Sequence, residues 1–119
     1  MSALENIGKS EFKEIEPKEV FTILEKHRGN PDFVVLDVRT PEEYEKGHIE
    51  NAHLLNAKSD SFEDEIGKMD KNRKYFVYCR TGRKSRKAVE LMQKSGYKEA
   101  HSIIGGMDKW KRRRLPVEK

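Results

Sequence analysis

Short apolar runs rich in β-branched residues, separated by helix-like segments, constrain the fold of this chain more than any other feature. The clearest runs are FVVLDV at residues 33–38 and YFVY at residues 75–78. Continuous apolar runs of this length are typical of strands that are buried on both faces. Two weaker runs lie at residues 52–56 and 101–104. Strands that alternate with helices predict an α/β domain with a mostly parallel sheet.

Helix signals lie between and after these runs. Pro17 fits the first turn of a helix whose apolar residues recur until the break at residues 28–31. Thr40, Pro41 and Glu43 match a capping box and predict a second, short helix. Three further helices are predicted. The helical spacing of Phe62, Ile66 and Met69 predicts one, and the segment after Gly105-Gly106 predicts another. Between them, a helix that stops at Gly96 is predicted from the spacing of Ala88, Leu91, Met92 and Ser95.

The composition indicates one folded domain with a highly charged surface. Of 119 residues, 39% are charged, against about 25% in an average domain. We expect a flexible N-terminal segment at residues 1–11 and a single domain at residues 12–119. The net charge is only +4, and we interpret the basic run at residues 109–114 as a solvated helix end. No apolar run is long enough to span a membrane, and no signal peptide is evident, so we expect a cytoplasmic protein.

The cysteine and histidine content limits the kinds of site that the chain can form. Cys79 is the only cysteine, which excludes an internal disulfide and a multi-cysteine metal site. The four histidines show no zinc-binding spacing. We therefore expect no metal site.

The loop that follows Cys79 has the features of an anion-binding site. In YFVYCRTGRKS, Cys79 stands at the carboxyl end of a predicted strand, which is where open α/β sheets bind ligands. Gly82 allows the loop to curl, so that backbone N–H groups converge ahead of a helix. Arg80, Arg83 and Lys84 add positive charge. These features favour a thiolate over a thiol.

A free cysteine after a β-branched strand can also be no more than a small buried hydrophobic residue. The glycine and the cations at the start of the predicted helix favour the reactive thiolate instead. No histidine–asparagine pair is evident in the sequence, which argues against a thiol protease. Chemistry that needs only a nucleophile and an anion cradle fits these residues better.

The chain resembles the rhodanese family of sulfurtransferases, in its single-domain form, over nearly its whole length. The matching segments are FVVLDVRTPEEYEKGHIENA, YFVYCRTGRKS, GYKEAHSIIGGMDKW and LPVEK. The resemblance implies a rhodanese-like, mostly parallel five-stranded sheet flanked by helices on both faces. It also implies that Cys79 accepts a sulfane sulfur as a persulfide and passes it to a nucleophile.

The resemblance assigns Cys79 as the catalytic sulfur carrier. It assigns the substrate-binding loop to Arg80, Thr81, Gly82, Arg83, Lys84 and Ser85. The family usually ends this loop with arginine, and lysine at position 84 keeps the charge but lacks the fork that grips two oxygens. This difference bears on substrate preference more than on persulfide chemistry. Asn51 stands where the family often has glycine, and we expect a turn there.

Other residues of the resemblance are expected to support the site rather than react. Asp37 and Arg39 follow a central strand, where a buried aspartate requires a partner. His48 is expected to be a hydrogen-bonded structural histidine. Gly105, Gly106 and Trp110 are expected to be turn and packing devices near the site.

Three functions remain open. The preferred one is a sulfurtransferase that takes a sulfane sulfur from thiosulfate or a persulfide donor and passes it to cyanide, a biological thiol or a sulfur-relay protein, with no cofactor. A phosphatase or arsenate reductase of this fold requires arginine six positions after the cysteine, where Ser85 stands. A non-catalytic rhodanese-like binding module commonly lacks the cysteine. We expect a monomer with no nucleic-acid or membrane partner.

Overall fold

A central sheet of parallel strands organises residues 11–119, which are the residues that this computed structural model describes. The elements in chain order are β1 (Glu11–Ile15), α1 (Pro17–Lys26), β2 (Phe33–Asp37), α2 (Pro41–Lys46), β3 (His53–Leu54), α3 (Phe62–Lys68), β4 (Lys74–Tyr78), α4 (Arg83–Lys94), β5 (Glu99–Ile103) and α5 (Gly106–Arg112). The five described strands have the order β1-β5-β4-β2-β3, and each neighbouring pair is parallel. The predicted α/β fold is confirmed, with a sheet that is wholly parallel.

The edge strand β1 is the element that the sequence pattern does not predict. Its sequence is EFKEI, and three of its five residues are charged. It pairs with β5 along its length, from Glu11 opposite Glu99 to Ile15 opposite Ile103. The segment expected to be flexible, residues 1–11, lies outside the described residues except for Glu11.

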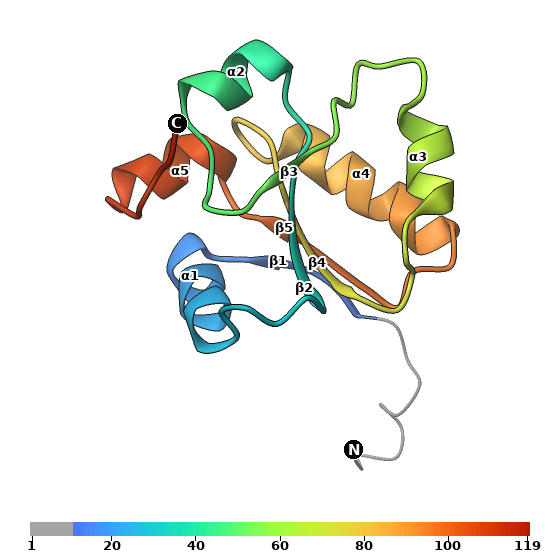
Figure 1. Cartoon of the computed structure of the whole chain (residues 1–119), viewed down its shortest axis with the longest axis horizontal. Coiled ribbons are helices and arrows are strands. Elements are labelled where there is room, and N and C mark those ends of the chain that lie inside the picture. Colours follow the sequence, from blue (N-terminus) through green and yellow to red (C-terminus); the bar gives the residue numbers. More distant parts are fainter. Residues whose placement is uncertain (1–10) are drawn as a thin grey trace.

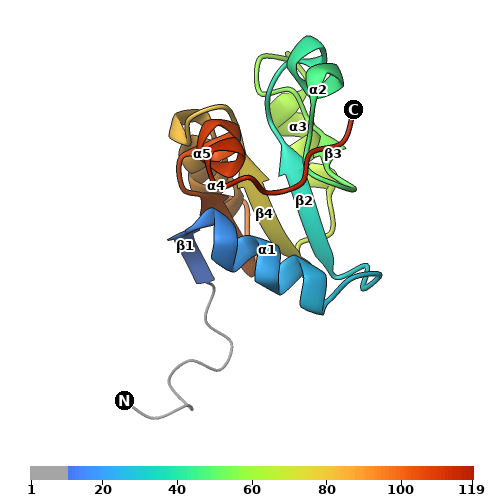
Figure 2. The same cartoon turned by 90° about the vertical axis from the view of Figure 1, so that its left-hand side faces the viewer.

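Helices cover both faces of the sheet (Figures 1 and 2). On one face α3 and α4 pack on a core that includes Leu36, Tyr75 and Val77. On the other face α1 and α5 pack on a core that includes Phe76 and Tyr78. Successive residues of β4 thus point to opposite faces, as a strand requires. This explains why the central strands are apolar without alternation.

The predicted helix signals lie where the structure begins and ends its helices. Pro17 occupies the first turn of α1. Thr40 caps α2, because its side chain accepts from the Glu43 N–H while the Glu43 carboxylate accepts from the Thr40 N–H. After α4, Gly96 adopts a φ of +94° in the left-handed region.

The carboxyl ends of the parallel strands lie at one edge of the sheet. There β2 leads into Arg39, β4 leads into Cys79, and β5 leads into Gly105. The fold therefore brings together three segments that are far apart in the sequence.

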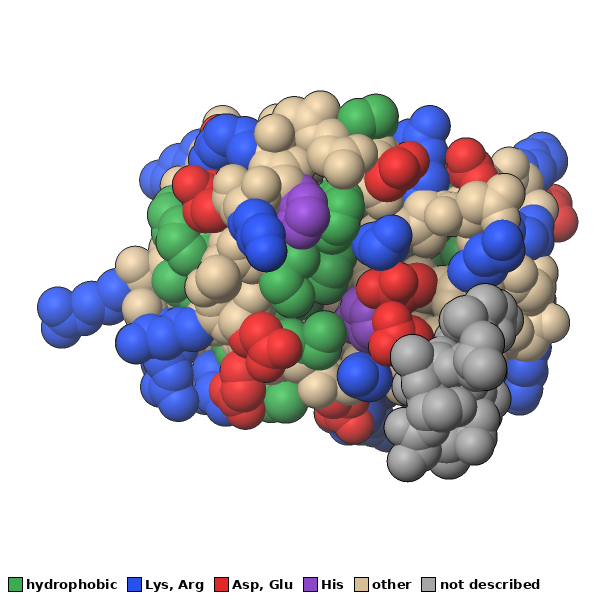
Figure 3. Space-filling view, turned by 90° about the horizontal axis from the view of Figure 1, so that it is seen from below, with side chains coloured by type: hydrophobic (Ala, Val, Ile, Leu, Met, Phe, Trp, Pro, Cys, Tyr) green, Lys and Arg blue, Asp and Glu red, His purple; other side chains and the backbone are tan. Residues whose placement is uncertain are grey.

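Charges of both signs cover the face seen from below, around a small hydrophobic patch (Figure 3). This mixture differs from the single basic stripe typical of a nucleic-acid surface. Among residues 11–119, no helix combines the length and the apolar character needed to cross a membrane.

Candidate active site

The loop between β4 and α4 folds around the Cys79 sulfur. Gly82 adopts a φ of +102° and lies directly before α4. This left-handed conformation, which glycine adopts readily, turns the Gly82 N–H toward Cys79 Sγ at 3.1 Å. Only 3% of Cys79 is exposed. The sulfur therefore lies at the bottom of the loop, facing the start of a helix.

The pKa of the Cys79 thiol lies below its ordinary value. Burial is the largest influence and acts to raise this pKa, because it penalises the charged form. Hydrogen bonds from the backbone N–H groups of Ser85, Gly82 and Thr81, together with the Ser85 side chain, outweigh burial. The loop geometry therefore favours the thiolate.

Ser85 is a buried neighbour of the Cys79 sulfur. Its hydroxyl lies 3.7 Å from Cys79 Sγ, donates to the Gly82 carbonyl at 3.1 Å, and lies 2.7 Å from the Ser102 hydroxyl. Ser85 and Ser102 are both about fully buried. The sequence analysis does not identify Ser102 as a neighbour of the site, because no motif around it resembles a site motif. Ser102 reaches Ser85 only through the pairing of β5 with β4.

The start of α5 holds the Cys79 loop from the other side. The N–H of Met107 donates to the Cys79 carbonyl at 2.8 Å, and the N–H of Asp108 donates to the Arg80 carbonyl at 3.0 Å. A Cβ atom added to Gly106 would lie 2.3 Å from the Cys79 carbonyl oxygen. Only glycine permits the α5 backbone to lie this close to the Cys79 carbonyl. The predicted turn at Gly105-Gly106 therefore also holds the backbone of the Cys79 loop in place.

A cavity of about 240 Å³ opens above Cys79. Its lining residues are Arg39, Glu43, Cys79, Arg80, Thr81, Arg83 and Lys84. Arg80, Arg83 and Lys84 have exposed side chains, and Arg80 lies 3.9 Å from Asp108. Positive charge thus surrounds the entrance, while backbone N–H groups lie at the floor.

Glu43 is a site residue that the sequence analysis does not identify as one. It is recognised there only as part of the capping box, yet its side chain lines the same cavity as Cys79. Burial acts to raise the pKa of this carboxyl, but the hydrogen bonds from Thr40 and the charges of Arg39 and Lys84 lower it. A carboxylate therefore stands among the cations.

Asp37 and Arg39 form a buried ion pair beside the cavity. The Arg39 guanidinium donates to both Asp37 oxygens, at 2.9 and 2.7 Å, and to the Gly47 carbonyl at 2.6 Å. The Tyr78 hydroxyl donates to Asp37 at 2.6 Å and accepts from the Ile49 N–H at 3.1 Å. The Asp37 carboxylate is fully buried, and this network supplies the partners that its burial requires.

His48 and Trp110 lie outside the lining of this cavity. His48 Nδ1 lies 3.0 Å from the Tyr44 carbonyl, and its ring stacks on Tyr44 at 3.9 Å. Trp110 is buried and donates from its indole N–H to the Pro116 carbonyl at 2.8 Å. Asn51 adopts a φ of +63°, which is the turn expected at that position.

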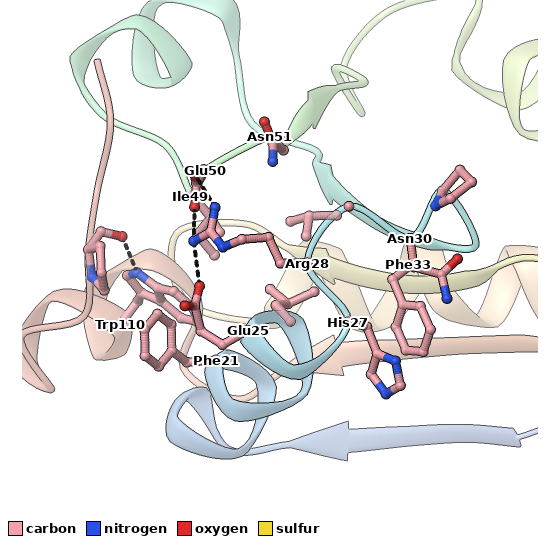
Figure 4. A pocket seen from close by; sticks show the side chains of 15 residues that line it. Phe21, Glu25, His27, Arg28, Asn30, Phe33, Ile49, Glu50, Asn51 and Trp110 are labelled. Carbon is pink, nitrogen blue, oxygen red and sulfur yellow. Dashed lines mark hydrogen bonds and ion pairs between the residues drawn. The ribbon is translucent and has the colours of Figure 1, made fainter.

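A larger pocket of about 420 Å³ lies elsewhere, between α1, β2 and Trp110. Arg28 crosses its opening and pairs with Glu25 at 2.6 Å and with Glu50 at 2.8 Å (Figure 4). The lining of this pocket contains no thiol and no hydroxyl side chain, and its arginine is already paired with two carboxylates. The smaller cavity, which contains the thiol, is therefore the candidate active site. Within the described residues, no cluster of His, Cys, Asp or Glu has the form of a metal site.

Comparison with known proteins identifies relatives of the chain. The rhodanese-like domain profile matches residues 21–113. The thiosulfate sulfurtransferase GlpE of Coxiella burnetii is 36% identical over 101 residues, covering 84% of this chain and 88% of that protein. GlpE of Actinobacillus pleuropneumoniae is 31% identical over 108 residues, covering 90% of this chain and 94% of that protein. The crystal structure of a rhodanese-related protein from Thermoplasma volcanium superposes with a TM-score of 0.76 at 24% identity, covering 89% of this chain and 97% of that one.

Proposed function

The chain belongs to the rhodanese-like domain family, and from that premise we propose that it is a thiosulfate sulfurtransferase that works through a persulfide on Cys79. The observation that carries this proposal is the Cys79 thiol, which faces loop N–H groups at the floor of a cavity with a cationic entrance. The name of the GlpE relatives supports thiosulfate as the donor.

In the first half of the reaction, the Cys79 thiolate attacks the outer sulfur of thiosulfate. A bond forms between Sγ and that sulfur, and the sulfur–sulfur bond of thiosulfate breaks, so that sulfite leaves with the electron pair. Arg80, Arg83 and Lys84 attract the dianion to the cavity. The enzyme is left with a persulfide whose terminal sulfur carries the negative charge.

In the second half, a nucleophile such as cyanide or a thiolate attacks the terminal sulfur of the persulfide. The bond between that sulfur and Sγ breaks, and the electron pair returns to Sγ as a thiolate. The N–H groups of Thr81, Gly82 and Ser85 stabilise this leaving thiolate, because they already point to the sulfur. No separate base is needed, since Cys79 starts and ends each cycle as a thiolate.

Intact mass spectrometry tests this proposal directly. Incubation with thiosulfate should add one sulfur atom to the protein, and cyanide should remove it and release thiocyanate. Cys79→Ser should gain no sulfur, and Ser59→Ala, a change in an exposed loop, should load normally. A wild-type protein that gains no sulfur from thiosulfate or from a persulfide donor would refute the proposal and favour a non-catalytic binding module.

A further inference from the structure

A second groove adjoins the Cys79 cavity and shares one residue with it. The groove has a volume of about 300 Å³ and lies between α3 and α4, which stand side by side on one face of the sheet (Figure 1). Lys84 lines both the groove and the Cys79 cavity. The groove and the cavity of the reactive sulfur are therefore neighbours, separated by the Lys84 side chain.

The floor of the groove is apolar. Phe62 of α3 and Ala88 of α4 belong to the buried core, and Ala57 and Leu91 are partly buried against the same core. These side chains leave a shallow apolar surface between two helices. Such a surface fits the carbon skeleton of a small organic molecule better than it fits an inorganic anion.

The rim of the groove is cationic. Lys58, Lys84 and Lys87 are exposed and line the groove, together with one carboxylate, Glu63. Within residues 11–119, none of these lysines takes part in a salt bridge. Three ammonium groups without a salt bridge, of which Lys84 also acts on the charge of Glu43, face one carboxylate in the groove and complement a ligand with carboxylates.

The direction of the groove sets the length of its ligand. Lys84, Lys87, Ala88 and Leu91 are three or four residues apart and therefore share one face of α4. At 1.5 Å of rise per residue, the stripe from Lys84 to Leu91 extends roughly 10 Å from the mouth of the Cys79 cavity. This length fits a molecule of about three amino-acid units with its reactive group at one end.

We propose that the α3–α4 groove binds the sulfur acceptor, and that this acceptor is a small organic thiol that carries carboxylates. This inference rests on the proposed function, because it names the class of thiol that removes the sulfur. The thiol ionises by losing its proton to solvent, and the thiolate attacks the terminal sulfur of the Cys79 persulfide. The bond to Sγ breaks, the pair returns to Cys79, and the acceptor leaves as a persulfide.

Single-turnover discharge of the purified persulfide protein tests the inference. Glutathione is the anionic thiol probe, and glutathione diethyl ester has the same skeleton with its carboxylates masked. When the thiol is at a limiting concentration, glutathione should discharge the persulfide at least about fivefold faster than the ester does. The reason is that the glutathione carboxylates can form several exposed charge pairs with the lysines of the groove, whereas the ester cannot. Lys58→Ala and Lys87→Ala should each reduce the rate with glutathione by about two- to fivefold and should leave the rate with the ester nearly unchanged.

Lys94→Ala is the matched control, because Lys94 is an exposed lysine of α4 that does not line the groove. It should leave both rates unchanged. If Lys94→Ala reduces the glutathione rate as much as Lys87→Ala does, general attraction by the protein's charge explains the preference and the groove is not the acceptor site. Equal rates for glutathione and its ester would overturn the inference while leaving the sulfurtransferase proposal intact.

A binding experiment tests the groove even if no persulfide forms. S-methylglutathione cannot accept sulfur, so it can be titrated into the unloaded protein and followed by amide chemical shifts in NMR. Shifts at Lys58, Phe62, Lys87 and Leu91 would support the inference. Shifts confined to the pocket around Arg28 and Trp110, or none at all, would overturn it.

Discussion

Replacing Gly106 by alanine should disturb the Cys79 loop without touching any side chain of the site. An added Cβ atom would lie 2.3 Å from the Cys79 carbonyl oxygen and 2.7 Å from the Arg80 carbonyl oxygen. Both are backbone atoms, so neither can rotate away as a flexible side chain would. Either α5 or the loop must move, and the hydrogen bonds from Met107 and Asp108 to these carbonyls must lengthen or break.

The destabilisation can be separated into parts. Gly106 has a φ of +57°, where alanine costs about 1–2 kcal/mol, partly offset by about 0.4–1 kcal/mol from a less flexible unfolded chain. Loss of the hydrogen bonds adds about 1 kcal/mol for each of the two. Overpacking against the carbonyls adds about 1–3 kcal/mol. The free energy of unfolding should therefore fall by about 3–7 kcal/mol.

Gly29→Ala is the control that isolates the backbone strain. Gly29 also has a positive φ, +85°, but an added Cβ would have no atom within 4 Å. The substitution should cost about 0–1.6 kcal/mol, which is the backbone contribution alone, and the activity of the protein should not change. Urea unfolding and the rate of persulfide formation measure the two effects. Equal destabilisation by both substitutions, with persulfide formation unchanged in Gly106→Ala, would refute the claim that α5 holds the loop.

Other predictions concern the charges of the site. In steady-state assays, Lys84→Ala should raise the KM for thiosulfate by about two- to fivefold, as expected for the loss of one exposed charge. Lys84→Arg should preserve or improve kcat/KM. An unchanged KM in Lys84→Ala would exclude a role of Lys84 in binding thiosulfate. Asp37→Ala should lower the free energy of unfolding by about 3–5 kcal/mol, because it leaves the buried Arg39 unpaired; unchanged melting with lost activity would instead assign Asp37 to the chemistry. The alkylation rate of Cys79 should have its midpoint below the ordinary thiol pKa of about 8.5, and Ser85→Ala should raise that midpoint. An alkylation midpoint at or above that of a free cysteine would contradict the role of the loop. Because the pKa of Cys79 is lower in the folded state than in the unfolded state, the thiolate's contribution to stability is complete above about pH 8.5 and is lost as the pH falls through the folded-state pKa. Cys79→Ser should abolish this pH dependence of stability.

Much of the fold could be predicted because its signals are local. The capping box at Thr40 depends on side chains three residues apart, and the turn at Gly96 depends on one glycine. The buried strands β2 and β4 are identifiable from their apolar residues alone. β1 gives no such signal, because an edge strand needs only part of its surface buried, and its remaining positions carry charge.

The parts of the site that could not be predicted come from contacts between distant segments. Ser102 reaches the Ser85 hydroxyl only because β5 pairs with β4, and Glu43 lines the cavity only because β2 lies beside β4. The sequence analysis attributes thiolate activation partly to the cations of the loop. In the structure, the hydrogen bonds that lower the pKa of Cys79 come from Ser85, Gly82 and Thr81, while the cationic side chains are exposed.

In the proposed reaction, this arrangement separates activation of the thiol from capture of the substrate. Activation depends on backbone N–H groups near a buried sulfur, which solvent and salt screen little. Capture depends on exposed side chains that share the entrance with Glu43 and are readily screened. The backbone part requires Gly82 and Gly106, and apart from Ser85 the loop side chains are absent from the hydrogen bonds that lower the pKa of Cys79. We therefore expect lysine in place of arginine at position 84 to alter which anions the cavity prefers and to leave the reactivity of Cys79 in place.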